Sequence, residues 1–106
     1  MDYILIVVTV SSKEEAEKIA TALLKKKLIA CANIFGPVAS HFWWQGKIDK
    51  AEEYVMFMKT KRELFKQVAS NVKQLHSYEV PEIIALPIIE GFKPYLEWID
   101  NSLSGK

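Results

Sequence analysis

Cysteine is almost absent from this 106-residue chain, which contains a single one, Cys31. No disulfide can form within the chain, and a lone thiol is typical of a reducing compartment. An excess of either charge is also lacking, because 14 basic and 13 acidic side chains leave a formal net charge of +1. Binding to a phosphate backbone needs a clustered excess of Lys and Arg, so we do not expect nucleic acid as a partner.

Long apolar runs are missing as well. The apolar run over residues 4–10 is far shorter than the ~20 residues that cross a bilayer, and no basic signal-peptide segment flanks it. We therefore expect no membrane partner and predict a cytoplasmic protein. Hydrophobic residues make up 50% of the chain and charged residues 25%, which indicates one soluble globular domain over residues 1–106.

What the chain does contain is a regular alternation of strand-like and helix-like patterns. Three of the strand-like segments are apolar on both alternating sets of side chains, as in strands that are covered on both faces. A bend is expected at Gly36-Pro37 inside the second strand. Gly46-Lys47 and the polar stretch 49–53 are expected to turn the chain into the third strand of a long hairpin. The expected strands are residues 3–10, 29–45, 54–60 and 82–89.

Two capping-box spacings mark the expected starts of helices. Ser12 precedes Glu15 by three residues and Thr60 precedes Glu63 by three, so that each side chain of a pair could satisfy the other's backbone donor. Apolar side chains at helical spacing follow both signals, and Pro94 suits the first turn of a short third helix. The expected helices extend over residues 12–27, 60–76 and 95–103.

The resulting order, β-α-β-β-α-β plus a terminal helix, predicts an α+β, ferredoxin-like fold with a four-stranded antiparallel sheet. Strands one and three would be central, and strand four, which contains Pro87, would lie at an edge. The two main helices would cover only one face of a sheet that is apolar on both. An exposed Val, Ile or Phe forfeits roughly 1.5 to 3 kcal/mol relative to a buried one. We therefore expect the second face to meet further copies of the chain.

Four separated motifs in the sequence are distinctive. They are Cys31-x-Asn33, Trp44-x-Gly46-Lys47 with Glu53, Lys59-Thr60, and His76-x-Tyr78-Glu79-x-x-Glu82. In this order and spacing the chain resembles the CutA divalent-cation-tolerance family, from the first strand to the terminal helix. The resemblance implies a ferredoxin-like homotrimer with clefts between subunits and a link to tolerance of copper and other divalent metals. It also implies an architecture similar to that of PII signalling proteins, and no enzymatic activity.

The sequence departs from this family at its copper ligands. The resemblance implies that copper binding in some relatives uses a Cys in the first strand and two adjacent His before the Tyr. Here Val8 occupies the first position, Leu75-His76 replaces the His pair, and Ser77 replaces a Pro. A copper or zinc ion would thus need other ligands. The candidate metal ligands are His76, Glu79, Glu82 and Cys31.

Each candidate ligand also has a structural interpretation. Cys31 fits either a small buried residue in an apolar strand or a ligand of soft Cu(I). His76 lies at a helix C-terminus, where the dipole favours a protonated imidazole, and it is a metal ligand in the alternative. Glu79 and Glu82 suit a divalent ion, general acid-base chemistry, or pairing with Lys59 or the next subunit.

A second group of side chains is expected to line the intersubunit clefts or to anchor the interface. Tyr78 would bury its ring and form a hydrogen bond through its hydroxyl. The Trp side chains favour packing and interface contacts, with stacking of a ligand as the alternative. The group comprises Asn33, Trp44, Lys59, Tyr78 and Trp98.

Two functions follow from these patterns. The first is a homotrimer that binds a metal ion or a small ligand in its clefts and serves metal tolerance. The second is a PII-like signalling protein or an interaction scaffold without specific metal binding. We do not expect an enzyme, because the sequence contains no recognisable nucleophile-base pair, phosphate loop or metal motif of catalytic spacing.

Overall fold

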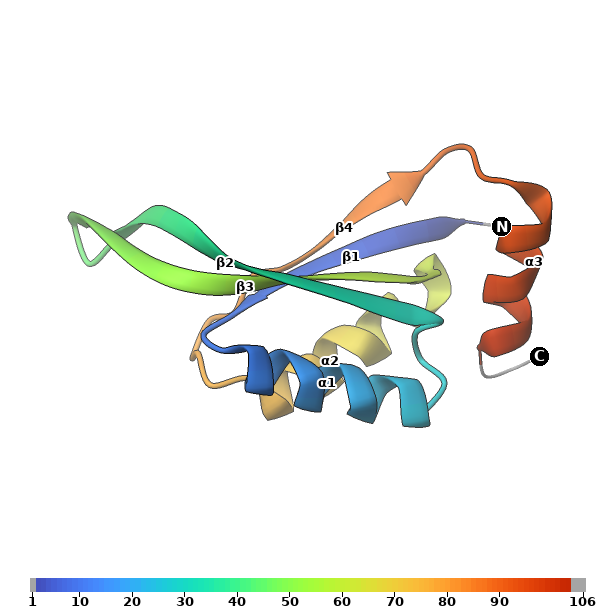
Figure 1. Cartoon of the computed structure of the whole chain (residues 1–106), viewed down its shortest axis with the longest axis horizontal. Helices are drawn as coiled ribbons and strands as arrows, with labels where there is room; N and C mark the ends of the chain where they lie inside the picture. Colours follow the sequence, from blue (N-terminus) through green and yellow to red (C-terminus); the bar gives the residue numbers. More distant parts are fainter. Residues whose placement is uncertain (1, 104–106) are drawn as a thin grey trace.

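The computed structural model describes residues 2–103. Its strands form one antiparallel sheet, and the order of the strands across it is β2-β3-β1-β4, so the predicted central and edge positions are confirmed (Figure 1). The βαββαβ order, followed by a third helix, confirms the predicted fold class. The strands are β1 (Tyr3–Val10), β2 (Cys31–Trp44), β3 (Lys47–Lys61) and β4 (Ile83–Ile88). The helices are α1 (Lys13–Lys25), the short 3₁₀ turn η1 (Arg62–Leu64), α2 (Phe65–Leu75) and α3 (Lys93–Ser102).

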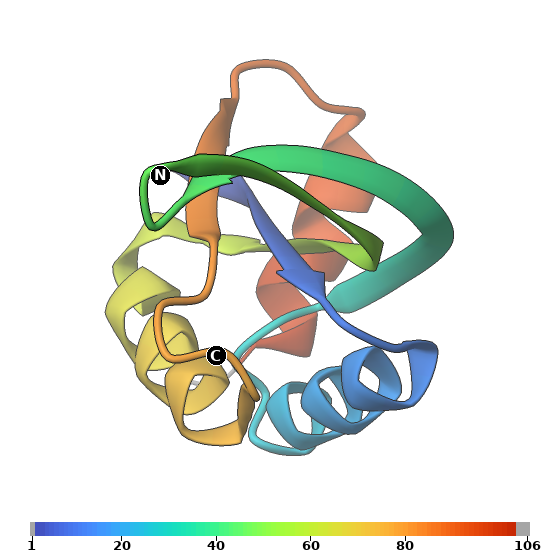
Figure 2. The same cartoon turned by 90° about the vertical axis from the view of Figure 1, so that its left-hand side faces the viewer.

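The core lies between the sheet and the helices α1 and α2, which pack side by side on one face (Figures 1 and 2). Strand β1 alternates strictly between buried and half-buried residues, because successive side chains point to opposite faces of a sheet. The apolar stripes of both helices have the predicted spacing. The fully buried residues include Ile6, Val8, Val10, Ile19, Leu23, Met56, Met58, Val68 and Val72.

The hairpin of β2 and β3 extends well beyond the helices (Figure 1). Its turn consists of Gln45 and Gly46, whose φ angles of 51° and 77° have the sign that a tight type I′ turn requires. The predicted bend is confirmed by a register shift between Phe35 and Val38. The predicted turn is confirmed for Gly46 but is wrong for Lys47 and residues 49–53, because β3 already begins at Lys47. Within residues 2–103 no helix packs on the outer part of this ribbon, residues 41–50, so its strands need no apolar alternation there.

The two predicted capping boxes differ from the structure. At α1, the Ser12 hydroxyl accepts a hydrogen bond from the Glu15 amide at 3.1 Å, but the Glu15 carboxylate accepts from Ser11 instead of Ser12. The box of Thr60 and Glu63 is absent. Thr60 is fully buried in β3, and its hydroxyl donates to the carbonyl oxygen of Leu28 at 2.7 Å. Pairing with β1 extends β3 to Lys61, so the helix begins later, at η1 and α2.

The sheet face opposite α1 and α2, called the open face below, is covered by helix α3 only at one end. There the Tyr3 hydroxyl donates to Asp100 at 2.9 Å, and the Lys61 ammonium lies 3.2 Å from the other oxygen of Asp100. Several apolar side chains of the open face remain partly or largely exposed, as predicted. They are Leu5, Val7, Phe35, Phe57, Ile84 and Leu86.

None of the helices in the part of the chain that the structure describes is long and apolar enough to span a membrane.

Candidate functional site

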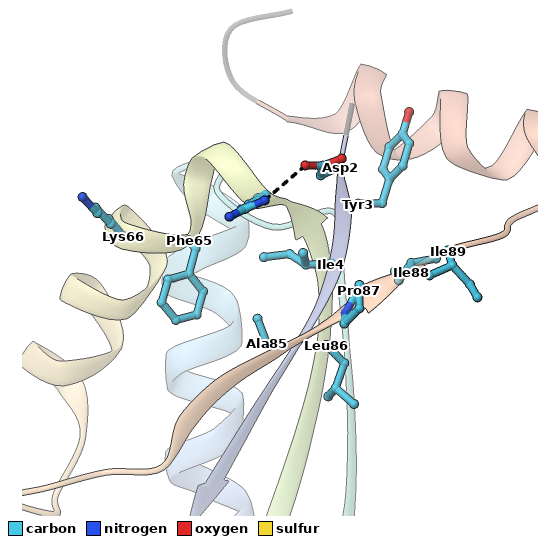
Figure 3. Close-up of a pocket in the computed structure, with 11 residues that line it drawn as sticks. Asp2, Tyr3, Ile4, Phe65, Lys66, Ala85, Leu86, Pro87, Ile88 and Ile89 are labelled. Atoms are coloured by element: carbon cyan, nitrogen blue, oxygen red, sulfur yellow. Dashed lines mark hydrogen bonds and ion pairs between the residues drawn. The ribbon is translucent and has the colours of Figure 1, made fainter.

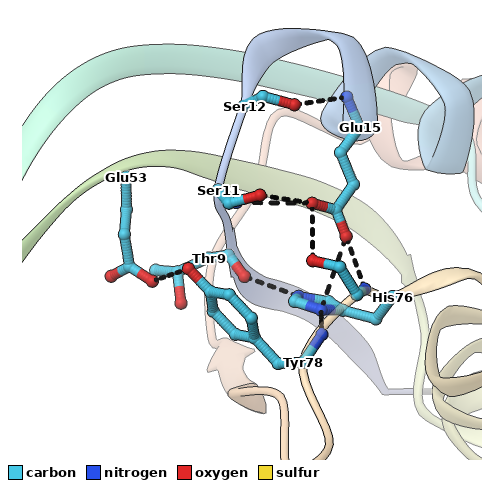
Figure 4. Close-up of polar contacts among 8 residues, drawn as sticks. Thr9, Ser11, Ser12, Glu15, Glu53, His76 and Tyr78 are labelled. Carbon is cyan, nitrogen blue, oxygen red and sulfur yellow. Dashed lines mark hydrogen bonds and ion pairs between the residues drawn. The ribbon is translucent and has the colours of Figure 1, made fainter.

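The segment from His76 to Glu82 forms a corner between α2 and β4, next to the end of β1 (Figure 4). The His76 side chain is buried in this corner. Its Nε2 atom lies 2.7 Å from the carbonyl oxygen of Thr9, and its Nδ1 atom lies 3.0 Å from the amide nitrogen of Tyr78. Because a carbonyl only accepts and an amide N–H only donates, Nε2 donates to Thr9 and Nδ1 accepts from Tyr78 in these contacts. The Glu15 carboxylate also lies 3.5 Å from Nδ1. A metal ion could bind to His76 only by replacing one of these two hydrogen bonds.

Glu15 of α1 holds the corner against the start of its helix (Figure 4). One carboxylate oxygen accepts from the Ser77 amide at 2.7 Å, and the other accepts from the hydroxyls of Ser77 and Ser11 at 3.1 and 2.9 Å. Burial alone would raise the pKa of Glu15, but these hydrogen bonds outweigh it and the pKa is lowered. The sequence pattern identified Glu15 only as a helix cap, because its partner Ser77 is distant along the chain.

Tyr78 and Glu53 form a second contact of the corner, this time with β3 (Figure 4). The Tyr78 hydroxyl donates to the Glu53 carboxylate at 2.8 Å, which confirms the hydrogen bond expected of this hydroxyl. Burial, together with the hydrogen bond and the charge of Glu53, raises the pKa of Tyr78 to about 12. Glu53 is only 7% exposed despite its charge. It was part of a sequence motif, but the motif did not show that Glu53 contacts Tyr78.

The two candidate carboxylates that follow Tyr78 are exposed. Glu82 accepts a hydrogen bond from the Thr9 hydroxyl at 3.3 Å. The predicted pairing of Glu79 or Glu82 with Lys59 does not occur within the chain, because Lys59 donates to the side-chain oxygen of Asn33 instead. Lys59 lies opposite Leu5, four residues along β1 from Thr9, which corresponds to roughly 13 Å. A contact between these carboxylates and another subunit stays a prediction.

Cys31 lies at the other end of the open face, beside α3. Its sulfur is 3.7 Å from the Tyr95 hydroxyl, and the Tyr95 and Trp98 rings are 5.4 Å apart. Burial, together with the hydrogen bond to Cys31, raises the pKa of Tyr95. Cys31 pairs with Lys59 across the strands, and Lys59 binds Asn33. Tyr95 is a member of this cluster that sequence reasoning missed.

The predicted cleft residues are thus divided among three places. Asn33, Lys59 and Trp98 lie near Cys31, whereas Tyr78 belongs to the corner of His76. Trp44 lies at the end of the long hairpin, where its side chain is half-exposed.

The four predicted metal ligands likewise do not meet within one chain. Cys31 is at the α3 end of the open face, whereas His76, Glu79 and Glu82 belong to the corner. Among residues 2–103, no three His, Cys, Asp or Glu side chains are grouped closely enough to hold a metal ion. A metal site made from these residues therefore needs more than one copy of the chain, as the predicted intersubunit clefts would provide.

Comparison with known proteins gives consistent results. A family model described as CutA1 divalent ion tolerance protein matches residues 4–102. The divalent-cation tolerance protein CutA of Archaeoglobus fulgidus is 52% identical over 98 residues, which are 92% of this chain and 95% of that protein. The chloroplastic protein CutA 1 of Oryza sativa is 41% identical over 99 residues, or 93% of this chain and 56% of that protein. The solved structure of the periplasmic divalent cation tolerance protein CutA from A. fulgidus has a TM-score of 0.92 and 51% identity, covering 94% of this chain and 97% of the other.

Proposed function

Because this chain belongs to the CutA1 divalent ion tolerance family, we propose that it serves tolerance of divalent metals, copper among them, as a homotrimer. In this proposal a metal ion or a small ligand binds in clefts between the subunits. The family relation supports the link to divalent cations, and the open face of the sheet supports the assembly.

The open face is the observation that carries the proposal. Ile84 and Leu86 are 49% and 46% exposed on it, and Phe35 is 44% exposed. Complete burial of such a side chain from water contributes about 1.5 to 3 kcal/mol, so each of these half-exposed side chains gains roughly half of that when it is covered. The edge strands β2 and β4 also have backbone groups available for pairing with another chain, and Trp43 on the hairpin is 73% exposed. Burying these surfaces between copies supplies the free energy that holds the trimer together.

Assembly would also create the metal site. The corner of one subunit contributes the exposed carboxylates Glu79 and Glu82, and the α3 end of another contributes Cys31. Carboxylate oxygens with a thiolate or an imidazole form a mixed donor set that suits a borderline divalent ion such as copper or zinc. His76 joins this set only if it gives up the Tyr78 amide or the Thr9 carbonyl.

Calorimetric titration of the assembled protein with Cu(II), Zn(II) and Cu(I) tests the metal site. We expect saturable heat for one of these ions with the wild type and its loss in the double variant Glu79→Gln/Glu82→Gln. The matched control is Asp49→Asn/Glu52→Gln, which removes two exposed carboxylates of the hairpin and should bind as the wild type does. Negligible heat for all three ions, or equal heat with both double variants, would remove metal binding at the corner from the proposal.

A second function is a PII-like signalling protein or an interaction scaffold without specific metal binding. The observation that favours it is the closed network of the corner, in which both ring nitrogens of His76 already have partners within the chain. This function predicts that a partner protein is captured equally by the wild type and by the variant Cys31→Ser/His76→Gln. Capture that depends on added metal would argue against it.

The site of action within the cell stays a prediction. Of the relatives named above, one is described as periplasmic and another as chloroplastic. A cytoplasmic location for this chain rests on its lone cysteine. Fractionation of cells that express the tagged full chain, with markers for each compartment, tests this location.

A further inference from the structure

The open face of the sheet has an apolar middle. Figure 3 shows how the two faces are divided near α3: Ile4 points toward Phe65 of α2, whereas Tyr3 and Leu86 lie on the other side of the sheet. Side chains alternate along each strand, so every second residue of β1, β3 and β4 shares the open face with Tyr3 and Leu86. The rows across its middle are apolar and consist of Leu5, Val7, Val55, Phe57, Ile84 and Leu86.

The end of the open face near α3 carries two cations, and only one of them has a counter-ion. Lys61 lies 3.2 Å from Asp100 of α3, so its charge is balanced within the chain. Lys59, two residues away on the same strand and face, donates to the neutral amide oxygen of Asn33. Among residues 2–103, no carboxylate forms an ion pair with Lys59. Lys59 therefore has no counter-ion in the described part of its own chain.

The other end of the open face has the opposite charge. Glu82 directly precedes β4, and its carboxylate accepts a hydrogen bond from the hydroxyl of Thr9 on the open face. Within residues 2–103, no Lys or Arg forms an ion pair with Glu82. Lys59 lies opposite Leu5, four residues and roughly 13 Å along β1 from Thr9. The charges at the two ends therefore do not meet within one chain.

We infer that Glu82 of one subunit is the counter-ion of Lys59 in a neighbouring subunit. The inference rests on the proposed function, in which further copies of the chain cover the open face. Covering this face removes Lys59 from water, and a charge that is taken out of water without a partner strongly destabilises a complex. A carboxylate of the neighbouring copy removes this cost, and Glu82 in turn obtains a cation.

The other carboxylates suit this role less well. Glu53 is 7% exposed and already accepts the hydroxyl of Tyr78. Glu79 lies in the bend before Glu82 and not beside a strand. The end of the hairpin has as many cations as carboxylates, so it has no excess charge to offer: Lys47, Asp49, Lys50 and Glu52. Glu82 is exposed, lies on the open face and binds only the neutral hydroxyl of Thr9 among the described residues.

This pair gives the contact between copies a direction. The cationic end of one open face meets the acidic end of the next, so each subunit uses two different surfaces, as in a heterologous ring. Cys31 is the cross-strand neighbour of Lys59, so the same contact brings Cys31 of one subunit toward Glu82 of another. Both are ligands of the proposed metal site, and Lys59 occupies the Glu82 carboxylate in the metal-free assembly.

Zero-length cross-linking of the assembled wild type tests the pair. A carbodiimide joins the amine of a Lys to a carboxylate only where the two are in contact. We expect covalent dimers on a denaturing gel and, in the dimer band, a linked peptide that joins Lys59 to Glu82. The variant Glu82→Gln should lose this link, whereas the matched control Glu17→Gln, an exposed position on α1, should keep it.

Charge reversal provides a second measurement. Lys59→Glu and Glu82→Lys each bring like charges together, so each should raise the dissociation constant of the assembly about thirtyfold or more. The double variant Lys59→Glu/Glu82→Lys restores opposite charges and should assemble nearly as the wild type does. The matched control reverses two exposed charges of the helix layer, Glu17→Lys/Lys73→Glu, and should leave the particle mass unchanged.

The inference is overturned if the assembled wild type gives no link between Lys59 and Glu82, or if Lys59 is linked to Asp49 or Glu52 instead. It is also overturned if the double variant assembles no better than the single ones. In each of these cases the wild type is still assembled, so the proposed assembly is unaffected. A wild-type particle of 12.1 kDa, in contrast, overturns the proposed assembly and the pair with it.

Discussion

Replacement of Glu15 by Gln should loosen the corner that carries His76 and Tyr78. The carboxylate accepts hydrogen bonds from the amide and the hydroxyl of Ser77 and from both groups of Ser11, and its side chain is only 11% exposed. Gln keeps one acceptor oxygen and replaces the other with an NH₂ group, which faces donors. A hydrogen bond to a charged group contributes about 1.5 to 3 kcal/mol. Gln loses at least the bond from the Ser77 amide, and the bonds to its remaining neutral oxygen are weaker than those to a carboxylate. We therefore expect the free energy of unfolding to fall by about 2 to 4 kcal/mol.

The effect should also depend on pH, and its sign follows from the lowered pKa of Glu15. A carboxyl group whose pKa is lower in the folded state stabilises the fold above its unfolded-state pKa, which is near 4.5. This stabilisation is lost as the pH falls through the lower folded-state value. The difference between the wild type and Glu15→Gln should therefore be largest at neutral pH and should shrink below about pH 4.5.

Equilibrium unfolding in urea at a fixed protein concentration measures this difference. Glu17→Gln, an exposed position of the same helix, is the matched control and should change stability by less than about 0.5 kcal/mol. Equal stability of Glu15→Gln and the wild type at neutral pH would refute the role of the carboxylate. If the difference in the free energy of unfolding between the wild type and Glu15→Gln stayed the same in acid, the charge of the Glu15 carboxylate would not be its cause.

Three other changes test local features of the fold and site. Gly36→Ala places a Cβ atom 2.9 Å from the Glu53 carbonyl oxygen at a φ of +150°, so thermal unfolding should show that the free energy of unfolding falls by more than about 2 kcal/mol. In the control Gly46→Ala the Cβ atom meets open space, and the free energy of unfolding should fall by only about 1 kcal/mol. In an ultraviolet titration of the wild type, the Tyr78 phenol should deprotonate near pH 12 instead of 10, and its signal is assigned by its loss in Tyr78→Phe. A pKa near 10 would contradict the contact of Tyr78 with Glu53. Thr60→Val should cost about 1 to 3 kcal/mol in urea unfolding because it leaves the Leu28 carbonyl without its donor, and a neutral result would contradict that bond.

The elements that could be predicted from the sequence are those with a local and periodic signal. The alternation of apolar residues in β1 and the helical spacing of Ile19 and Leu23 each reflect one buried surface of one element. The strand order followed from the connections between these elements, and Pro87 agreed with an edge position. Such features depend on neighbours along the chain, so their prediction does not require tertiary contacts.

The parts that were missed depend on residues far apart in sequence. Glu15 has the spacing of a capping box with Ser12, yet Ser77, which the fold brings to α1, competes for its carboxylate. Thr60 likewise bonds to the carbonyl of Leu28 because β3 buries it there. The predicted metal ligands Cys31 and His76 lie in different parts of the structure, and no spacing along the sequence could show their separation.

Sedimentation velocity of the purified chain at micromolar concentration measures most directly whether further copies cover the open face. We expect a particle of three times the chain mass of 12.1 kDa, with no smaller species on dilution. The variant Ile84→Asp/Leu86→Asp, which places charges on the open face, should dissociate that particle. A wild-type particle of 12.1 kDa that stays soluble and folded would contradict the shared clefts and the function built on them.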